Sequence, residues 1–333
     1  MQKSIVLIIR DGWGINPNPD HNAIANAYTP STDLLLKKYP NTILEASGTS
    51  VGLPEGYQGS SEVGHLNIGA GRIVEQEITK ITNNIQDGTF FNSPVFRKAI
   101  KNVIDNNSSL HLMGLVQDEG VHAHQDHLFA IMKHAKEQGV KQLYIHFFAD
   151  GRDSAPKSTI NYLRTLKEKI DEYGIGEIAT FMGRYYAMDR GKEWQLTTRA
   201  YNAITKGEGK KINTEENLED AIQEVYKTKT PNGKDMFDEY IPPLIIGGYE
   251  GLNDGDSVIH FNYRQDRAIQ LTMVFIEDDY PGERWKKFDI VYCGLTRYYD
   301  TFPFNILEPM DDGGGMDNLL SQILSQRGLK QIR

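Results

Sequence analysis

The chain has 333 residues, enough for two domains, and 39% hydrophobic with 24% charged residues is typical of a soluble globular protein. The formal net charge of −9 argues against a general nucleic-acid or membrane-surface binder. The single cysteine, Cys293, excludes an intramolecular disulfide and a cysteine-based zinc cluster, and it fits a cytoplasmic location. An anionic ligand would therefore need a local cluster of Arg or Lys.

Short apolar segments alternate with helical patterns along the chain. The first segment, 4–9, is followed at once by Arg10, so it predicts neither a signal peptide nor a membrane span. Strands are predicted at 4–9, 110–116, 142–148, 177–183, 257–263 and 288–295, and helices at 125–139, 157–174, 193–207 and 214–228. The strands lack strict apolar–polar alternation, as expected when both faces of a parallel sheet are buried. The predicted fold class is therefore α/β.

Polar and charged residues recur directly after the predicted strands. They are Asp11 after the first strand, then Asp118, His122 and His124, then Asp150, Arg152 and Asp153, then Arg184, and finally Arg264 and Arg267. In open α/β sheets, ligands bind beyond the carboxyl ends of the strands. The pattern predicts a binding site there, although turns are often polar without having a function.

Five arginines stand out in these loops: Arg152 in "DGRDS", Arg184 and Arg190 in "GRYYAMDR", and Arg264 and Arg267 in "RQDRA". Arg264 and Arg267 share a face if their segment opens a helix, where an anion is already favoured. Arginines bind phosphate or carboxylate bidentately, so the group predicts a small anionic substrate. The alternative is structural pairing, because each of these arginines except Arg184 has an Asp within three residues.

The segment "HAHQDH", from His122 to His127, matches the H-x-H-x-D-H pattern of metallo-β-lactamase-like hydrolases. Because His is a common metal ligand, the pattern allows a zinc-dependent metallohydrolase. Such a site needs further histidines downstream, and after His146 the chain has only His260. The alternative is that these residues line a polar pocket and cap the following helix.

The segment "GSSEVGHLNIGAG", residues 59–71, is rich in glycine and contains two adjacent serines. Glycines let backbone N–H groups approach an anion, so one hypothesis is a loop that presents Ser61 as a metal-activated nucleophile. Asp11, in "RDGWG", is placed to ligate a hard cation or to cap a turn. A flexible turn without chemistry is the alternative for both.

Six segments together carry a resemblance to a known family. In order they are "DGWG", "GSSEVGHLNIGAGRIV", "GLVQDEGVHAHQDHL", "DGRDSAPKS", "GRYYAMDR" and "FNYRQDRAIQ". The chain resembles cofactor-independent phosphoglycerate mutase over its whole length. The resemblance implies an alkaline-phosphatase-like α/β domain interrupted by an inserted α/β phosphotransferase domain. On this chain, 1–75 would begin the phosphatase-like domain, 76–309 would form the insert, and 310–333 would return to the first domain.

The resemblance also implies an activity, which is the interconversion of 3-phosphoglycerate and 2-phosphoglycerate in a cytoplasmic, usually monomeric enzyme. Ser61 would carry the phosphoryl group as a phosphoserine, without bisphosphoglycerate. Two divalent cations, usually manganese with magnesium as the alternative, would include Asp11 and Ser61 among their ligands. Asp153 would also handle the glycerate hydroxyl proton. The substrate-binding residues would be His122, Arg152, Asp153, Arg184, Arg190, Arg264 and Arg267.

Some positions depart from the family pattern. Ser60 replaces an Asn, Glu119 a Gly, Ala123 a Ser and Gln265 a Pro, while "DDGGG" at 311–315 is an unusual segment near a hinge. Family members are also much longer, and most of their metal ligands and a substrate-binding lysine would lie beyond Arg333. The chain is therefore expected to be an amino-terminal portion of the enzyme. The alternative to turnover is a fragment that binds phosphoglycerate without converting it.

Overall fold

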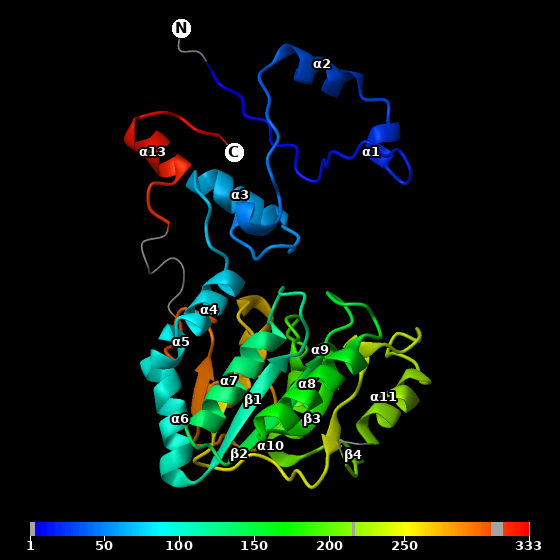
Figure 1. Ribbon diagram of the computed structural model, residues 1–333, viewed down its shortest axis with the longest axis vertical. Helices are drawn as coiled ribbons and strands as arrows, with labels where there is room; N and C mark the ends of the chain where they lie inside the picture. The colour runs from blue at the N-terminus through cyan, green and yellow to red at the C-terminus, as the bar shows by residue number, and fades with distance from the viewer. Residues whose placement is uncertain (1–3, 215–216, 308–315, 333) are drawn as a thin grey trace. The chain divides into compact units, whose positions relative to one another are not determined.

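The computed structural model describes residues 4–214, 217–307 and 316–332. The chain divides into two compact units (Figure 1): unit 1 is Met1–Gln76 with Met316–Arg333, and unit 2 is Glu77–Gly315. Identifying these units with a phosphatase-like and a phosphotransferase domain stays a prediction. The predicted boundary at 309/310 and the "DDGGG" segment lie outside the described residues.

Unit 2 is built on a seven-stranded sheet of order β4-β5-β3-β2-β1-β6-β7. The strands are β1 (Ser109–Leu115), β2 (Gln142–Ala149), β3 (Glu177–Gly183), β4 (Lys210–Ile212), β5 (Leu244–Ile246), β6 (Ser257–His260) and β7 (Val291–Gly294). All neighbours pair in parallel except β3 and β5, which are antiparallel. The central strands are buried almost throughout, because helices cover both faces. The predicted α/β fold class is confirmed.

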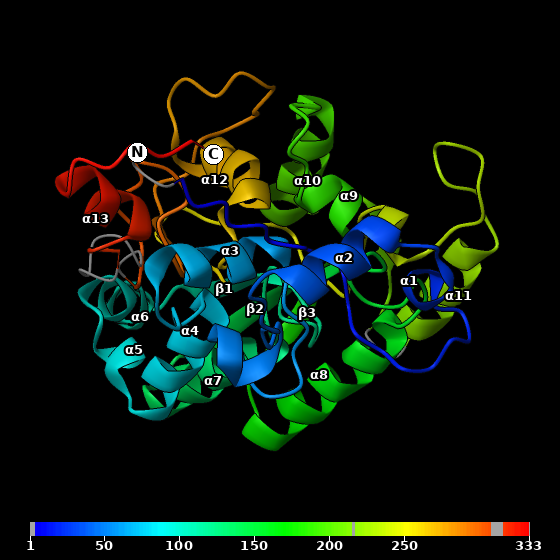
Figure 2. The same ribbon diagram turned by 90° about the horizontal axis from the view of Figure 1, so that it is seen from above.

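Helices of unit 2 lie on both faces of the sheet. They are α4 (Glu77–Gln86), α5 (Thr89–Asn92), α6 (Pro94–Asn106), α7 (Gln125–Glu137), α8 (Thr159–Tyr173), α9 (Arg184–Ala187), α10 (Trp194–Lys206), α11 (Leu218–Tyr226) and α12 (Ile269–Ile276), with 3₁₀ turns η3 (Asp238–Tyr240) and η4 (Gln265–Arg267). Helices α7 and α8 cover one face, and α10 and α12 cover the other (Figure 2). No described helix is long and apolar enough to cross a membrane.

The four predicted helices are confirmed, and local chemistry sets their ends. His124 caps α7 by accepting a hydrogen bond from the backbone N–H of Asp126. Gly174 and Gly207, both left-handed, end α8 and α10, as glycine does at helix C-termini. The last predicted helix, 214–228, is described as a helix only from Leu218 to Tyr226.

The predicted strands of unit 2 are also present, but two are shorter than expected. The strand expected at 257–263 ends at His260, and the one expected at 288–295 spans only Val291–Gly294. Strands β4 and β5 were not predicted. At three residues each, they are too short to give a periodic pattern.

A chain of buried polar side chains crosses the middle of the sheet. His111 Nε2 lies 3.2 Å from Asp256 Oδ2, and His111 Nδ1 lies 3.0 Å from His146 Nε2. His146 Nδ1 lies 3.0 Å from Thr180 Oγ1. This row of side chains joins the start of β6 to β1, β2 and β3, and its hydrogen bonds satisfy polar groups that would be costly to bury alone.

Unit 1 contains α1 (Ala23–Asn26), α2 (Pro30–Lys38), η1 (Gly48–Val51), α3 (Ser61–Ala70) and α13 (Leu320–Gln326). The strand predicted at 4–9 was wrong for this structure. The segment pairs with no strand among the described residues, and Ile5 is 93% and Val6 80% exposed. Apolar composition favours a strand, but a strand forms only when another strand satisfies its backbone N–H and C=O groups.

The serine-rich segment of unit 1 is mostly helical, so the predicted loop at 59–71 was wrong as well. Helix α3 begins at Ser61, and Ser60 caps it by accepting a hydrogen bond from the N–H of Val63. Gly71 ends the helix in the left-handed conformation. A serine at this position is a standard N-cap, and this explains Ser60 without flexibility.

Candidate functional site

The predicted substrate-binding residues of unit 2 meet at the carboxyl ends of the central strands. His122 follows β1, Arg152 and Asp153 follow β2, Arg184 follows β3, and Arg264 follows β6. The peptide N–H groups of Tyr263 and Arg264 both donate to the carbonyl of His122, at 2.8 and 3.3 Å. These bonds join the loops after β1 and β6, where the strand order reverses direction. Open α/β sheets place ligand sites at this point.

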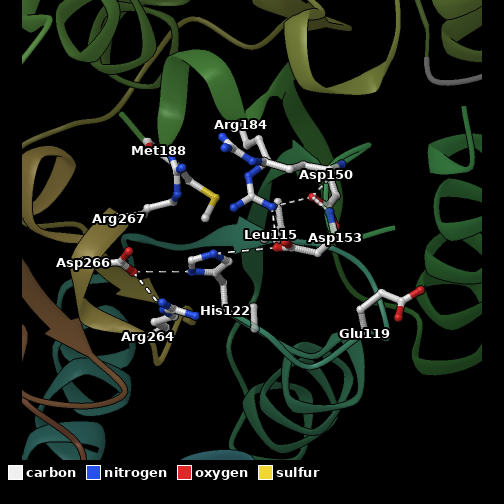
Figure 3. A network of polar contacts seen from close by, with 12 residues as sticks. Leu115, Glu119, His122, Asp150, Asp153, Arg184, Met188, Arg264, Asp266 and Arg267 are labelled. Carbon is white, nitrogen blue, oxygen red and sulfur yellow. Dashed lines mark hydrogen bonds and ion pairs between the residues drawn. The ribbon is translucent and has the colours of Figure 1, made fainter. Parts of the chain in front are cut away.

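Arg184 is the buried cation of this site, with a side chain 2% exposed. Its Nη1 donates to Asp150 Oδ1 and to Asp153 Oδ2, both at 2.5 Å (Figure 3). Burial lowers the pKa of Arg184, but the two carboxylates outweigh burial and raise it overall. Asp150 also accepts the backbone N–H groups of Arg152, Asp153 and Ser154. One buried carboxylate thus fixes both the loop after β2 and the Arg184 guanidinium.

His122 lies between two carboxylates at the centre of the view in Figure 3. Its Nε2 is 3.6 Å from Asp153 Oδ2 and its Nδ1 is 3.8 Å from Asp266 Oδ1. Burial, followed by the charges of Arg184, Arg264 and Arg267, lowers the pKa of His122 to about 3. The ring is therefore neutral at pH 7 and carries one proton for two carboxylate neighbours.

Asp266 binds two further cations of the site. Arg190 Nη1 donates to Asp266 Oδ2 at 2.6 Å, and Arg264 Nε donates to Asp266 Oδ1 at 3.1 Å. Both arginines remain about half exposed, at 54% and 44%. Both side chains are therefore partly accessible from solvent.

The two remaining arginines have different partners. Arg267 Nη1 donates to the carbonyl of Met188 at 3.0 Å, and Arg152 lies 3.4 Å from Glu239 Oε1. The pKa of Arg267 is lowered, first by burial and then by the positive charges of Arg184, Arg152 and Arg190. The arginines of the site thus lie close enough to repel one another.

All seven predicted substrate-binding residues are brought together in unit 2, whereas Asp11 and Ser61 belong to unit 1. Asp11 lies in an exposed turn. Ser61 is exposed at the first position of α3, with its Oγ 3.3 Å from His65 Nδ1. The side chain next to this hydroxyl is therefore an imidazole one helical turn away.

The described residues do not fit the ligand sets that the sequence suggested. They contain no group of three or more His, Cys, Asp or Glu able to hold a metal ion. Asp11 and Ser61 supply two oxygen donors, while a hard divalent cation takes about six ligands. In "HAHQDH", His124 caps α7 and His127 Nε2 lies 3.0 Å from Thr82 Oγ1. The metallohydrolase hypothesis is thus unsupported, and the capping alternative is confirmed for His124.

Three carboxylates hold the site together: Asp150, Asp266 and Glu239. Sequence reasoning named Asp150 only as a polar residue after a strand, and it assigned no role in the site to Asp266 or Glu239. The segments "DGRDS" and "RQDRA" did contain a signal for the first two, because an acid next to an arginine suggests a pair. That pattern was interpreted only as the alternative to function. Glu239 has no such signal, since 87 residues separate it from Arg152.

Comparisons with known proteins agree with this architecture. Residues 81–300 match the family described as BPG-independent PGAM N-terminus. The 2,3-bisphosphoglycerate-independent phosphoglycerate mutases of Acetivibrio thermocellus and Methanosarcina acetivorans are 43% and 45% identical over 99% and 100% of the chain. The match spans 64% of the length of each of these two relatives.

A solved structure is similar as well. The crystal structure of Leishmania mexicana phosphoglycerate mutase at low cobalt concentration superposes with a TM-score of 0.79 and 28% identity. That match covers 95% of this chain and 59% of the other. The family match covers most of unit 2, including the sheet and the loops after β1, β2, β3 and β6 that form the arginine site. The chain therefore belongs to the BPG-independent phosphoglycerate mutase family.

Proposed function

We propose that this chain takes part in the interconversion of 3-phosphoglycerate and 2-phosphoglycerate, and that unit 2 is the part that binds the phosphoglycerate. The reaction is an intramolecular phosphoryl transfer, so the chain would act as an isomerase without added bisphosphoglycerate. The family membership supports the reaction class, and the arginine site supports the substrate class. The alternative function, binding of phosphoglycerate without turnover, rests on the same site.

The observation that carries the proposal is the convergence of five arginines, from the loops after β2, β3 and β6, on one site at the carboxyl ends of the strands. Burial lowers the pKa of Arg267, and so do the positive charges of Arg184, Arg152 and Arg190, which shows that these groups lie close enough to repel it. The charge of Asp266 acts in the opposite direction. Arginine stays charged at all ordinary pH values, so the repulsion is not relieved by losing a proton. A phosphate or carboxylate among these groups removes it and accepts bidentate hydrogen bonds.

We assign substrate binding to His122, Arg152, Asp153, Arg184, Arg190, Arg264 and Arg267. Phosphoglycerate has two anionic groups, a phosphate and a carboxylate. The site offers separate cations for them, which are the half-exposed Arg190 and Arg264 and the more buried Arg267. Asp153 lies beside both Arg184 and His122. A carboxylate held in this way is suited to accept a hydrogen bond from a glycerate hydroxyl and to take its proton.

For phosphoryl transfer we propose Ser61 as the nucleophile. Its Oγ would form a bond to phosphorus as the bond to the C3 oxygen of 3-phosphoglycerate breaks, giving a phosphoserine and glycerate. Return of the phosphoryl group to the C2 oxygen would give 2-phosphoglycerate and free Ser61. The N-terminus of α3, where Ser61 lies, has backbone N–H groups and a partial positive charge that favour a phosphate.

Divalent cations enter this proposal only as family chemistry. Such ions activate a hydroxyl and neutralise charge on phosphorus, and manganese with Asp11 and Ser61 among its ligands is our proposal for this chain. The described residues supply only these two ligands and do not complete such a site. We also propose that the protein is monomeric and cytoplasmic.

Phosphorus NMR with isothermal titration calorimetry tests the proposal on the purified chain. We expect 3-phosphoglycerate to bind, with its phosphorus signal shifted or broadened by the protein. Arg267→Met should abolish binding, while Ser61→Ala should leave it unchanged. Appearance of a 2-phosphoglycerate signal in magnesium buffer would support turnover as well, and Ser61→Ala should remove that signal. No binding by the unaltered chain would refute the proposed function.

A further inference from the structure

Asp266 touches three groups of the arginine site that come from different parts of the chain. Its Oδ2 accepts from Arg190 at 2.6 Å, its Oδ1 accepts from Arg264 at 3.1 Å, and the same Oδ1 faces His122 Nδ1 at 3.8 Å. His122 follows β1, Arg190 lies between α9 and α10, and Arg264 precedes η4. Figure 3 shows His122, Asp266 and Arg264 converging on one side of the site.

The charge of Asp266 is secured by these same neighbours. Burial raises the pKa of Asp266, but the charges of Arg264 and Arg190, with the hydrogen bond from Arg190, outweigh burial and keep the pKa below its usual value. The carboxylate is therefore ionised at any pH at which the protein is expected to work. Each of its oxygens has a fixed role, since one accepts from Arg190 and the other from Arg264.

Asp266 is the acceptor for the side chains of Arg190 and Arg264, whereas other residues anchor the backbone of the loop that carries Arg190. Arg190 and Arg264 are long side chains that are about half exposed, so without a contact they would sample many rotamers. The loop that carries Arg190 is anchored separately. Gln270 of α12 donates to Asp189 Oδ2 at 2.7 Å and accepts from the N–H of Lys192 at 2.8 Å. The backbone of this loop is therefore held by contacts that do not involve Asp266.

We propose that Asp266 is a positioning residue that preorganises Arg190, Arg264 and His122 for the anionic groups of the substrate. This inference rests on the proposed function, because the ligand is phosphoglycerate in both. Ordering the arginines before binding removes an entropy cost that each would otherwise incur when it closes on the ligand. Asp266 is thus expected to strengthen the binding of an anion although it is itself an anion.

The direction in which Asp266→Asn changes the affinity for 3-phosphoglycerate distinguishes positioning from simple electrostatics. Asp266→Asn removes one negative charge from the site, so electrostatics alone predicts tighter binding of 3-phosphoglycerate. Positioning predicts weaker binding, by about tenfold, because Asn offers one neutral acceptor oxygen where Asp266 offers two charged ones, so that Arg190 or Arg264 meets an amide NH2 instead of an acceptor. Glu119→Gln is the charge-matched control. Glu119 is exposed, near Asp118, Asp150 and Asp153, and among the described residues no arginine of the site forms an ion pair with it.

The measurement is calorimetric titration of the complete chain and its variants with 3-phosphoglycerate. Weakening in Asp266→Asn, with Glu119→Gln unchanged or tighter, supports the inference. Equal or tighter binding by Asp266→Asn overturns it. Asp266→Glu keeps the charge but moves the carboxylate by one methylene, so it should recover part of the affinity. It also replaces the Asn variant if that variant does not fold.

A second readout separates this inference from the proposed function. The Nε–H groups of Arg190 and Arg264 are observed by nitrogen-15 NMR without any ligand, and their relaxation reports side-chain order. We expect the relaxation of both signals to indicate rigid side chains in the unaltered chain and mobile side chains in Asp266→Asn. If the unaltered chain binds no phosphoglycerate, the proposed function fails, and the relaxation data still decide whether Asp266 orders the arginines. Unchanged relaxation in the variant overturns the inference.

Discussion

Arg184 carries a charge that is almost completely withdrawn from water, and Asp150 is equally buried at 1% exposed. A buried ion pair gains little over an apolar pair of the same shape, but removing one partner leaves an uncompensated charge. The contact between Arg184 and the two carboxylates therefore makes the site and the stability of unit 2 depend on the same group.

Replacing Arg184 with Met should lower the free energy of unfolding of unit 2 by about 3–5 kcal/mol, because Asp150 is left buried without its cation. Urea denaturation followed by tryptophan fluorescence measures this. A Trp13→Phe background leaves only Trp194 and Trp285, both in unit 2.

The matched control is Arg164→Met. Arg164 is 61% exposed and pairs with Glu219 on the surface, so its loss should change stability little. Equal effects of the two substitutions would contradict the assignment of a buried charge network to Arg184.

The site was predictable from sequence at this scale only in part. Arg184 and His122 follow long apolar strands, so their place at one edge of the sheet could be predicted from the chain alone. What each one contacts could not be, because contacts such as Arg152 with Glu239 join segments far apart in sequence. An acid beside an arginine also has two interpretations, a neutralising pair or a positioning contact, and only geometry separates them.

At the scale of elements, the turn η3 packs tightly on the end of β3. A Cβ built on Gly183 would lie 2.2 Å from the carbonyl oxygen of Glu239, well inside van der Waals contact. The N–H of Gly183 also donates to the carbonyl of Ile241 at 2.8 Å. A side chain at 183 would therefore push η3, and with it Glu239, away from the strand that ends in Arg184.

Gly183→Ala should destabilise unit 2 by about 1–3 kcal/mol, the usual cost of overpacking, and should weaken phosphoglycerate binding. Stability is measured by urea denaturation and binding by calorimetry. Gly248→Ala is the control, because a Cβ there meets nothing within 4 Å. If Gly183→Ala behaved like Gly248→Ala in both measurements, close packing of η3 on β3 would not hold.

Elements were predictable where the pattern was long. The runs that became β1, β2 and β3 are seven or eight residues each, and α7, α8 and α10 show clear helical periodicity with an end signal. The segment 4–9 is just as apolar, yet it forms no strand here. Periodicity reports what a segment would bury, and it carries no information on whether a pairing strand is present.

For the whole molecule, the histidines of unit 2 link stability to pH. Burial lowers the pKa of His122, His127 and His260 to about 3, and it lowers that of His146 well below 6.5. In the unfolded chain each titrates near 6.5. Between these values the unfolded state binds more protons than the folded one, so stability is present above about pH 6.5 and is lost as pH falls.

We therefore expect the free energy of unfolding of unit 2 to fall steadily from pH 7 to pH 5, by roughly 1 kcal/mol per pH unit for each such histidine once pH is below 6, and the urea midpoint to fall with it. Three carboxyl groups of unit 2 act in the opposite sense and reduce this slope, because burial raises the pKa of Asp238 to about 6 and also raises the pKa values of Glu119 and Glu239. His127→Gln should make the dependence shallower by about one proton. A midpoint that stayed constant or rose on acidification would exclude this linkage.

The buried row of polar side chains that runs from Asp256 through His111 and His146 to Thr180 contains ring hydrogens that are shielded from solvent. Asp256 is an acceptor, so the hydrogen between it and His111 belongs to the imidazole, and a second ring hydrogen must lie between His111 and His146. Both histidines are 0% exposed. Because both rings are closed off from water, we expect neither hydrogen to exchange with solvent until β1 separates from its neighbours. The hydrogen–deuterium exchange rate of these two imidazole hydrogens should therefore report how often the centre of unit 2 opens.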